Sequence, residues 1–232
     1  MNLLALDTSS DACSVAVQAD KDIFEKHVIR AKEHTNILIP MIQKLLHDAG
    51  VELQDLDAIV LGNGPGSFIG MRIAASVAQG LAFGSGLQIV PVSSMAAIAA
   101  EVMDAYSATE VVVAQDAHMN EVYLGTYRSD GDGLPAAVTD ELILPIEQID
   151  ELTNVSPPEL YAAGKGWTKY PSLLELNRAA IAEIVDVSYP RAVYLLPLGT
   201  RACQDGEAIE PENLMPAYIR TKVAEKPRQI GS

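Results

Sequence analysis

The stretch that decides the fold is LLALDTSSDACSVAV, residues 3–17. It begins with a short apolar run that ends at Asp7, continues through a small polar turn, and then alternates small, polar and β-branched residues from Cys13 to Val17. Two such runs joined by turn-forming residues predict a β-hairpin. A mixed apolar and charged segment at 23–29 predicts a third, edge-like strand beside it.

The segments that follow alternate between helices and strands. Gly50 stands where a C-cap glycine would end the first helix. The predicted elements are a helix at 33–49, a strand at 58–61, a glycine-rich turn, a helix at 67–83, a strand at 89–92 and a helix opened by Ser93 and Ser94. The order β-β-β-α-β-α-β-α joins an antiparallel hairpin pair to parallel strands through helical crossovers, which is the order of a ribonuclease-H-like lobe.

A second, weakly similar opening follows in the other half of the chain. A Val-rich run at 110–114 leads to Asp116, a turn and a further apolar segment at 121–127. This repeat predicts an α/β protein of two lobes, residues 1–108 and residues 109–232. Further predictions for the second lobe are a turn at 130–133, strands at 138–144 and 160–163, a loop at 156–158, a helix at about 189–203 with Pro190 in its first turn, and a terminal tail within 211–232.

Composition and charge narrow the classes of function. Of the 232 residues, 49% are hydrophobic and 20% are charged, a balance typical of folded soluble proteins. Because the net charge is -15, we expect no unaided binding to nucleic-acid phosphates. Cys13 and Cys203 have the spacing of neither a disulfide framework nor a metal site, and the sequence shows no signal peptide and no membrane-spanning run. These features predict a cytoplasmic location.

Two turns carry residues that could meet a nucleotide. Asp7, Thr8 and Ser9 close the first strand, where a carboxylate and hydroxyl groups can hold a phosphate or its magnesium ion. Asp116 stands at the matching place in the second half. The alternative is structural, because Asp, Thr and Ser also bond their own backbone in ordinary turns.

A glycine-rich loop is a third candidate for phosphate binding. Gly64, Gly66 and Ser67 lie between a strand and a helix, where glycines free the backbone and the helix N-terminus presents N–H groups to an anion. Ser67 could instead simply cap the helix. The loop is not a Walker loop, because no Gly-Lys-Ser/Thr follows it.

The helices at 33–49 and 67–83 are more apolar than a surface helix requires. The apolar residues of the first helix spread over roughly twice the arc that a helix needs to cover its own core, and the second helix is apolar or small nearly all round. This surplus predicts a surface for a protein partner, although both helices could also be enclosed within the fold. The predicted interface consists of Leu38, Met41, Ile42, Leu45, Gly70, Met71, Ala74, Ala75 and Ala78.

The sequence predicts neither a metal site nor a catalytic centre. The four histidines, at 27, 34, 47 and 118, do not form the spacing that places two imidazoles on one metal ion. No Gly-x-Ser-x-Gly elbow is present, and Cys13 falls in a predicted strand, where packing is its expected role.

Four stretches resemble one known family. They are LALDTSSDACSVA at 4–16, GNGPGSFIGMRI at 62–73, DAHMNEVY at 116–123 and MPAYIR at 215–220. Together they resemble the TsaB (YeaZ) family over nearly the whole chain. Ile69 stands where the family usually has threonine, which removes a hydroxyl group from the glycine-rich loop.

The resemblance implies an actin-like (ASKHA) fold of two ribonuclease-H-like lobes. It also implies a role in forming N6-threonylcarbamoyladenosine at position 37 of tRNAs that read ANN codons. In that role the chain would be no enzyme itself but would bind and activate the catalyst TsaD and help to recruit the ATPase TsaE. The implied interface is helical, it makes homodimers when TsaD is absent, and tRNA is met only through the complex.

Two enzyme functions remain as alternatives. An actin-like ATPase or phosphotransferase would use Asp7, Thr8 and Asp116, and would need a glycine pair on the adenine side, for which Gly164 and Gly166 are a partial substitute. Lys165 and Trp167 could plug that cleft, so only weak ATP or ADP binding at the complex interface is expected. A peptidase acting on TsaD ranks last, because no nucleophile and base are evident.

Overall fold

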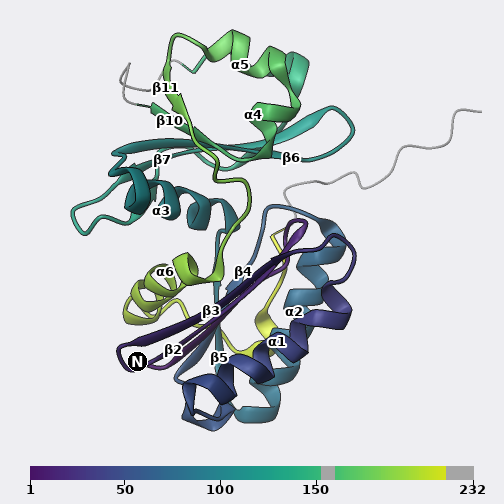
Figure 1. Ribbon diagram of the computed structural model, residues 1–232, viewed down its shortest axis with the longest axis vertical. Coiled ribbons are helices and arrows are strands. Elements are labelled where there is room, and N and C mark those ends of the chain that lie inside the picture. The colour runs from purple at the N-terminus through teal and green to yellow at the C-terminus, as the bar shows by residue number, and fades with distance from the viewer. Residues whose placement is uncertain (153–159, 218–232) are drawn as a thin grey trace, which may run out of the picture.

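A computed structural model describes residues 1–152 and 160–217. Its two lobes each contain one sheet with helices on both faces (Figure 1). The predicted loop at 156–158 and the end of the predicted tail, from residue 218, lie outside the described residues.

The first sheet has the predicted element order. Its order is β3-β2-β1-β4-β5, with antiparallel pairing among the first three strands of the chain and parallel pairing of β1 with β4 and of β4 with β5. The strands are β1 (Leu3–Asp7), β2 (Ala12–Ala19), β3 (Asp22–Ile29), β4 (Ala58–Gly62) and β5 (Gln88–Val92). Both β1 and β4 are buried throughout, as expected for the centre of a sheet covered on two faces.

Two helices, α1 (His34–Ala49) and α2 (Phe68–Ser85), cover the outer face of this sheet (Figure 1). The predicted C-cap of α1 is confirmed, because Gly50 adopts a left-handed conformation with φ of 67°. Ser67 caps α2, and its side chain accepts a hydrogen bond from the N–H group of Gly70. A short 3-10 helix (Leu53–Asp55) precedes β4.

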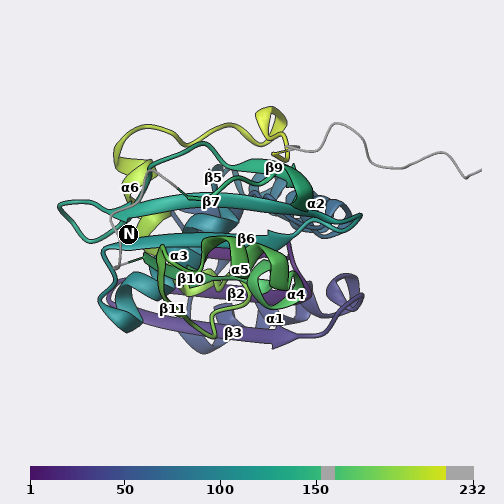
Figure 2. The same cartoon turned by 90° about the horizontal axis from the view of Figure 1, so that it is seen from above.

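The second sheet has the order β11-β10-β6-β7-β8, and β9 also pairs with β7 (Figure 2). Its strands are β6 (Glu110–Asp116), β7 (Glu121–Ser129), β8 (Pro135–Ala137), β9 (Leu142–Pro145), β10 (Leu160–Ala163) and β11 (Ile181–Ile184). The single strand predicted at 138–144 is confirmed only at its end, where β9 begins at Leu142, because β8 ends at Ala137 before the predicted segment. The outer helices are α4 (Lys165–Lys169) and α5 (Pro171–Asn177), and further 3-10 helices are Ile146–Gln148 and Pro211–Asn213.

Helices α3 (Ser94–Tyr106) and α6 (Ala192–Gln204) lie between the two sheets (Figure 1). Ser93 caps α3 as predicted, by accepting hydrogen bonds from two N–H groups of the first turn. The helix predicted from residue 189 begins later, because Arg191 is its N-cap and Pro190 precedes it.

The predicted division at 108/109 separates the sheets but not these two helices. Helix α3 comes from the first half of the chain yet packs on the second sheet, and α6 comes from the second half yet packs on the first. Each sheet has an inner apolar face that must be buried. In each lobe this face is covered by a helix from the other half of the chain. At Gly199 of α6, a Cβ would lie 2.4 Å from a methyl group of Val60, so only glycine permits this approach.

No helix within the described part of the chain combines the length and apolarity needed to cross a membrane.

Candidate functional site

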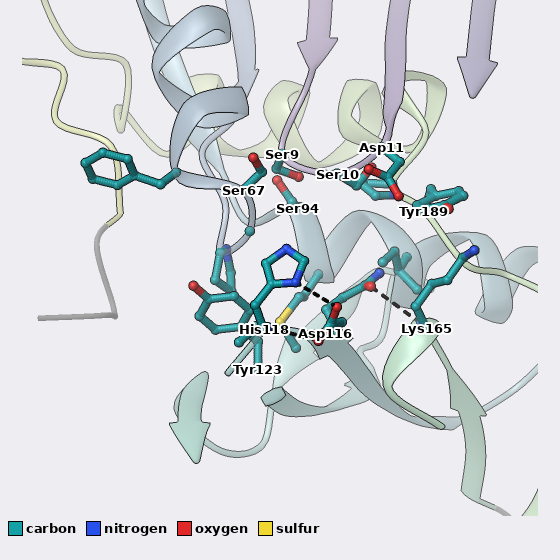
Figure 3. A pocket seen from close by; sticks show the side chains of 18 of the residues that line it. Ser9, Ser10, Asp11, Ser67, Ser94, Asp116, His118, Tyr123, Lys165 and Tyr189 are labelled. Carbon is teal, nitrogen blue, oxygen red and sulfur yellow. Dashed lines mark hydrogen bonds and ion pairs between the residues drawn. The ribbon is translucent and has the colours of Figure 1, made fainter. Parts of the chain in front are cut away.

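A cleft of about 470 Å³ opens between the two lobes. Ser9, Asp11 and Ser67 line it from the first lobe, and Asp116 and Lys165 line it from the second (Figure 3). The structure therefore brings the turns of both lobes to one place, as the repeated sequence pattern predicts. The chemistry of the cleft depends on what these side chains already bind.

Asp7 does not face the cleft, because its side chain is buried and fully used within the fold. Its Oδ1 accepts hydrogen bonds of 2.8 Å from both the N–H and the hydroxyl of Ser9, and its Oδ2 accepts one of 2.6 Å from the hydroxyl of Ser94. Burial raises the pKa of Asp7, and these hydrogen bonds only partly oppose the shift. Asp7 thus ties β1 to the start of α3. Its carboxylate is not the free magnesium ligand that the sequence suggested.

The glycine-rich loop packs against this same turn. The hydroxyl of Thr8 donates to the carbonyl of Gly70 at 2.7 Å, and the N–H of Ser67 donates to the carbonyl of Ser9 at 2.6 Å. A Cβ on Gly70 would lie 1.9 Å from the carbonyl oxygen of Thr8, and one on Gly66 would lie 2.2 Å from that of Ser9. These glycines therefore allow two backbones to touch.

Three N–H groups of the loop, at Gly64, Ser67 and Gly70, are engaged within the protein. The N–H of Gly64 donates to the hydroxyl of Ser94 at 3.0 Å, and the N–H groups of Ser67 and Gly70 donate to Ser9 and to the Ser67 side chain. The alternative interpretation, in which Ser67 caps a helix, is the one that the structure supports.

Asp116 lies in the cleft but is paired. Its carboxylate forms an ion pair of 2.5 Å with Lys169 and accepts hydrogen bonds from the hydroxyl of Tyr170 at 2.8 Å and the N–H of His118 at 2.9 Å. Burial alone would raise the pKa of Asp116, but Lys169, His118 and Tyr170 together lower it. The group is thus a carboxylate whose charge is already balanced by a neighbouring ammonium.

The glycine pair of the second lobe is structural as well. Gly164 has φ of 99°, and a Cβ there would lie 2.3 Å from the carbonyl oxygen of Ala114, while Gly166 packs against the same residue. Trp167 is 1% exposed and belongs to the core beneath this sheet, so the prediction that it plugs the cleft is wrong. Lys165 does line the cleft, and its Nζ lies 4.7 Å from the ring centre of Tyr189.

The nine residues of the predicted partner interface are all buried inside the first lobe, so the prediction that they form a free surface is wrong. Their apolar arc is wide because α1 and α2 contact the sheet and also each other. They are Leu38, Met41, Ile42, Leu45, Gly70, Met71, Ala74, Ala75 and Ala78.

A second set of side chains, which shares only Leu38 with the first, forms an apolar groove on the outside of these helices. Ile39 of α1 is 48% exposed and Ile69 of α2 is 71% exposed. They line a groove of about 380 Å³ together with His34, Thr35, Leu38, Phe68, Arg72, Ile73, Ser76 and Val77. Sequence reasoning missed Ile39 and Ile69, although each lies outside the spacing of the buried set of its helix.

Metal and nucleophile chemistry find no support in the described residues. No group of three His, Cys, Asp or Glu side chains within 1–152 and 160–217 could hold a metal ion. Cys13 is buried, and burial raises the pKa of its thiol to about 12, so it is protonated at neutral pH.

The fold defines a class, namely two-lobed actin-like α/β proteins, and in this chain the carboxylates at the ends of β1 and β6, Asp7 and Asp116, are engaged within the protein itself. The family model of TsaD, described as tRNA N6-adenosine threonylcarbamoyltransferase, matches residues 28–226. The chain belongs, within this class, to the TsaB (YeaZ) family.

The similarity to individual relatives extends over the whole chain. The chain is 34% identical over 226 residues to the tRNA threonylcarbamoyladenosine biosynthesis protein TsaB of Escherichia coli, covering 97% of both. It is 34% identical to the TsaB protein of Haemophilus influenzae over 97% of this chain and 96% of that one. The solved structure of YeaZ from Pseudomonas aeruginosa matches with a TM-score of 0.86 and 35% identity, over 94% of this chain and 99% of that one.

Proposed function

We propose that this chain is a cytoplasmic, non-catalytic subunit that binds and activates TsaD in the formation of N6-threonylcarbamoyladenosine at position 37 of tRNAs reading ANN codons. Membership of the TsaB family supports the pathway. The observation that carries the non-catalytic role is that Asp7 and Asp116, the carboxylates at matching places in the two lobes, are both engaged within the protein. Asp7 is buried under Ser9 and Ser94, and Asp116 is paired with Lys169, so neither is available to a magnesium ion.

Activation by such a subunit is a matter of differential binding. A partner that binds the competent conformation of TsaD more tightly than the others increases its population. This role requires a stable docking surface and no reactive group. A net charge of -15 further supports a division of labour in which TsaD supplies most contacts to tRNA and this chain reaches tRNA only through the complex.

The groove between α1 and α2 is the docking surface of this proposal. It is lined mainly by aliphatic side chains, and exposed apolar surface of this kind is typical of protein–protein contacts. We place TsaD there, with TsaE joining the assembled pair. In the absence of TsaD the same groove would hold a second copy of this chain.

The two alternative activities are less well supported. A phosphotransferase would need Asp116 free of Lys169, and a peptidase would need a nucleophile more reactive than the buried Cys13. We expect any weak binding of ATP or ADP at the interface with TsaD, because Asp7 and Asp116 are both engaged within this chain.

Size-exclusion chromatography with light scattering tests the proposal. The purified chain is mixed with TsaD, and the Ile39→Arg and Ile69→Arg variants place a charge in the groove. Ile23→Arg is the matched control, because Ile23 is 52% exposed on the edge strand β3. We expect a complex with the wild type and the control that is lost in both groove variants, and a parallel loss of threonylcarbamoyladenosine formation. Complexes that survive both groove variants would place TsaD elsewhere, and absence of any complex would refute the proposed function.

A further inference from the structure

The two lobes meet along a seam between α3 and α6. Helix α6 packs on the first sheet and α3 on the second, and the two helices contact each other between the sheets (Figure 1). Any change in the angle between the lobes must therefore move α6 relative to α3. The contacts that cross this seam decide whether such a change is easy.

Arg191 forms ion pairs at one end of the seam. Its guanidinium binds Glu25 of β3 in the first lobe through two nitrogens, and it binds Glu101 of α3 through Nη1 at 3.4 Å. Glu25 also accepts a hydrogen bond from the N–H of Val193 at 3.4 Å, in the first turn of α6. The Glu25 arm thus stays within the first lobe, whereas the Glu101 arm crosses to the helix that is packed on the second.

Arg201 joins the other end of α6 to the second lobe. It forms ion pairs with Asp130 and with Asp132, the latter at 2.7 Å, in the turn between β7 and β8 of the second lobe. Between the two arginines, the hydroxyl of Tyr194 donates to Asp104 of α3 at 3.4 Å. Asp132 is largely exposed, so solvent screens its pair with Arg201, whereas Asp130 is 26% exposed and its pair with Arg201 is screened less. At the Arg191 end the carboxylates of Glu25 and Glu101 are more buried than either.

Glu101 makes the Arg191 end costly to open. Its side chain is 14% exposed, and its Oε2 is buried without a hydrogen-bond partner among the described residues. Burial raises the pKa of Glu101, while Arg191 opposes this shift and Glu25 and Asp104 add to it. A movement of α6 that withdraws Arg191 while Glu101 stays covered would leave this buried carboxylate without its counter-charge, which is less favourable than breaking an exposed pair.

We propose that Arg191 acts as an interlobe latch which, through Glu101, holds the two lobes at one fixed angle, so that the cleft of this chain does not close by hinge motion. The latch is a property of the free chain and does not depend on the identity of the partner. Its consequence is that a partner meets a preorganised body and does not have to select one lobe arrangement among several.

Distances between spin labels, measured by pulsed electron paramagnetic resonance, test the latch. The labels are attached at Lys21→Cys in the β2–β3 turn and at Glu175→Cys in α5, both exposed positions, in a Cys203→Ser background, with the buried Cys13 left in place. Glu101→Gln cuts the arm that crosses the seam, Glu25→Gln cuts the arm within the first lobe, and Arg191→Met cuts both. The control is Arg30→Met, which removes an exposed ion pair with Glu33 inside one lobe.

We expect a single narrow distance distribution in the wild type and in the Arg30→Met control. Glu101→Gln and Arg191→Met should broaden or shift it, whereas Glu25→Gln should lower the midpoint of urea unfolding without changing the distribution. If Arg191→Met fails to fold, Glu101→Gln decides the question, because it keeps the pair with Glu25. Wild-type distributions in both Glu101→Gln and Arg191→Met, or an equally broad distribution in the wild type, would overturn the proposal.

Discussion

Replacing Gly70 by alanine tests whether the glycine-rich loop serves the fold or a ligand. The added methyl group would lie 1.9 Å from the carbonyl oxygen of Thr8, a backbone atom that cannot rotate away. Relief requires the start of α2 to move from the β1–β2 turn by more than 1 Å, roughly the difference between this distance and an ordinary van der Waals contact. A loop shaped for phosphate would instead lose ligand binding and keep its stability.

The size of the effect follows from three contributions. Overpacking of this kind costs about 2 kcal/mol. The movement also strains two hydrogen bonds, from Thr8 to Gly70 and from Ser67 to Ser9, each worth about 1 kcal/mol net. The higher helix propensity of alanine raises the free energy of unfolding by about 1 kcal/mol. The free energy of unfolding should therefore fall by about 3 kcal/mol, within a factor of two.

Gly80→Ala is the matched control in the same helix. A Cβ at Gly80 meets no atom within 4 Å, so only the helix propensity changes and the variant should gain about 1 kcal/mol. Urea unfolding followed by circular dichroism, without any ligand, measures both variants and should separate them by about 4 kcal/mol. A Gly70→Ala variant as stable as the wild type would refute the argument that the glycines exist for backbone contact.

Two further changes test the interior of the molecule. Because burial raises the pKa of Asp7 above the ordinary value of 3.8, its contribution to stability is present below that value and is lost as the pH rises through the raised pKa. The wild type should therefore lose stability relative to Asp7→Asn as the pH rises above about 4 in urea unfolding, and a difference that is independent of pH would contradict the shift. Gly199→Ala, whose methyl group would meet Val60 at 2.4 Å, should cost about 1–3 kcal/mol, whereas Gly84→Ala in open space should not destabilise; equal stabilities would show that α6 does not press on the first sheet.

The local elements of the fold could be predicted from sequence because their signals are local. Gly50, Ser67 and Ser93 mark helix ends through their own backbone preferences and hydrogen bonds. The first sheet followed from the alternation of apolar runs and helical spacing. These signals depend on neighbours a few residues away, and tertiary contacts strengthen them without changing their sense.

Pairings between distant residues could not be predicted in the same way. Lys169 neutralises Asp116 from 53 positions away, and no pattern in the sequence specifies that pair. The exchange of α3 and α6 between the sheets has the same origin, because an apolar helix face does not identify the sheet that it covers. The apolar faces of α1 and α2 are wide, as the sequence predicts. Width alone does not distinguish a helix enclosed on two sides from one with a free side.

The turn at residues 7–9 and the glycine-rich loop form a motif that is compatible with two roles. A carboxylate after a strand, followed by hydroxyl residues and opposed by glycines, is suited to holding a phosphate, since it offers hydrogen-bonding groups and close backbone approach. The same properties suit it to join a turn, a loop and a helix start, which is what Asp7, Ser94 and Gly64 do here. Deciding between the two uses requires the acceptors of the N–H and hydroxyl groups, and those of Thr8, Ser9 and Ser94 lie within the protein. The hydrogen bonds of Asp7 and Ser94 therefore stabilise the first lobe itself, whatever the cleft binds.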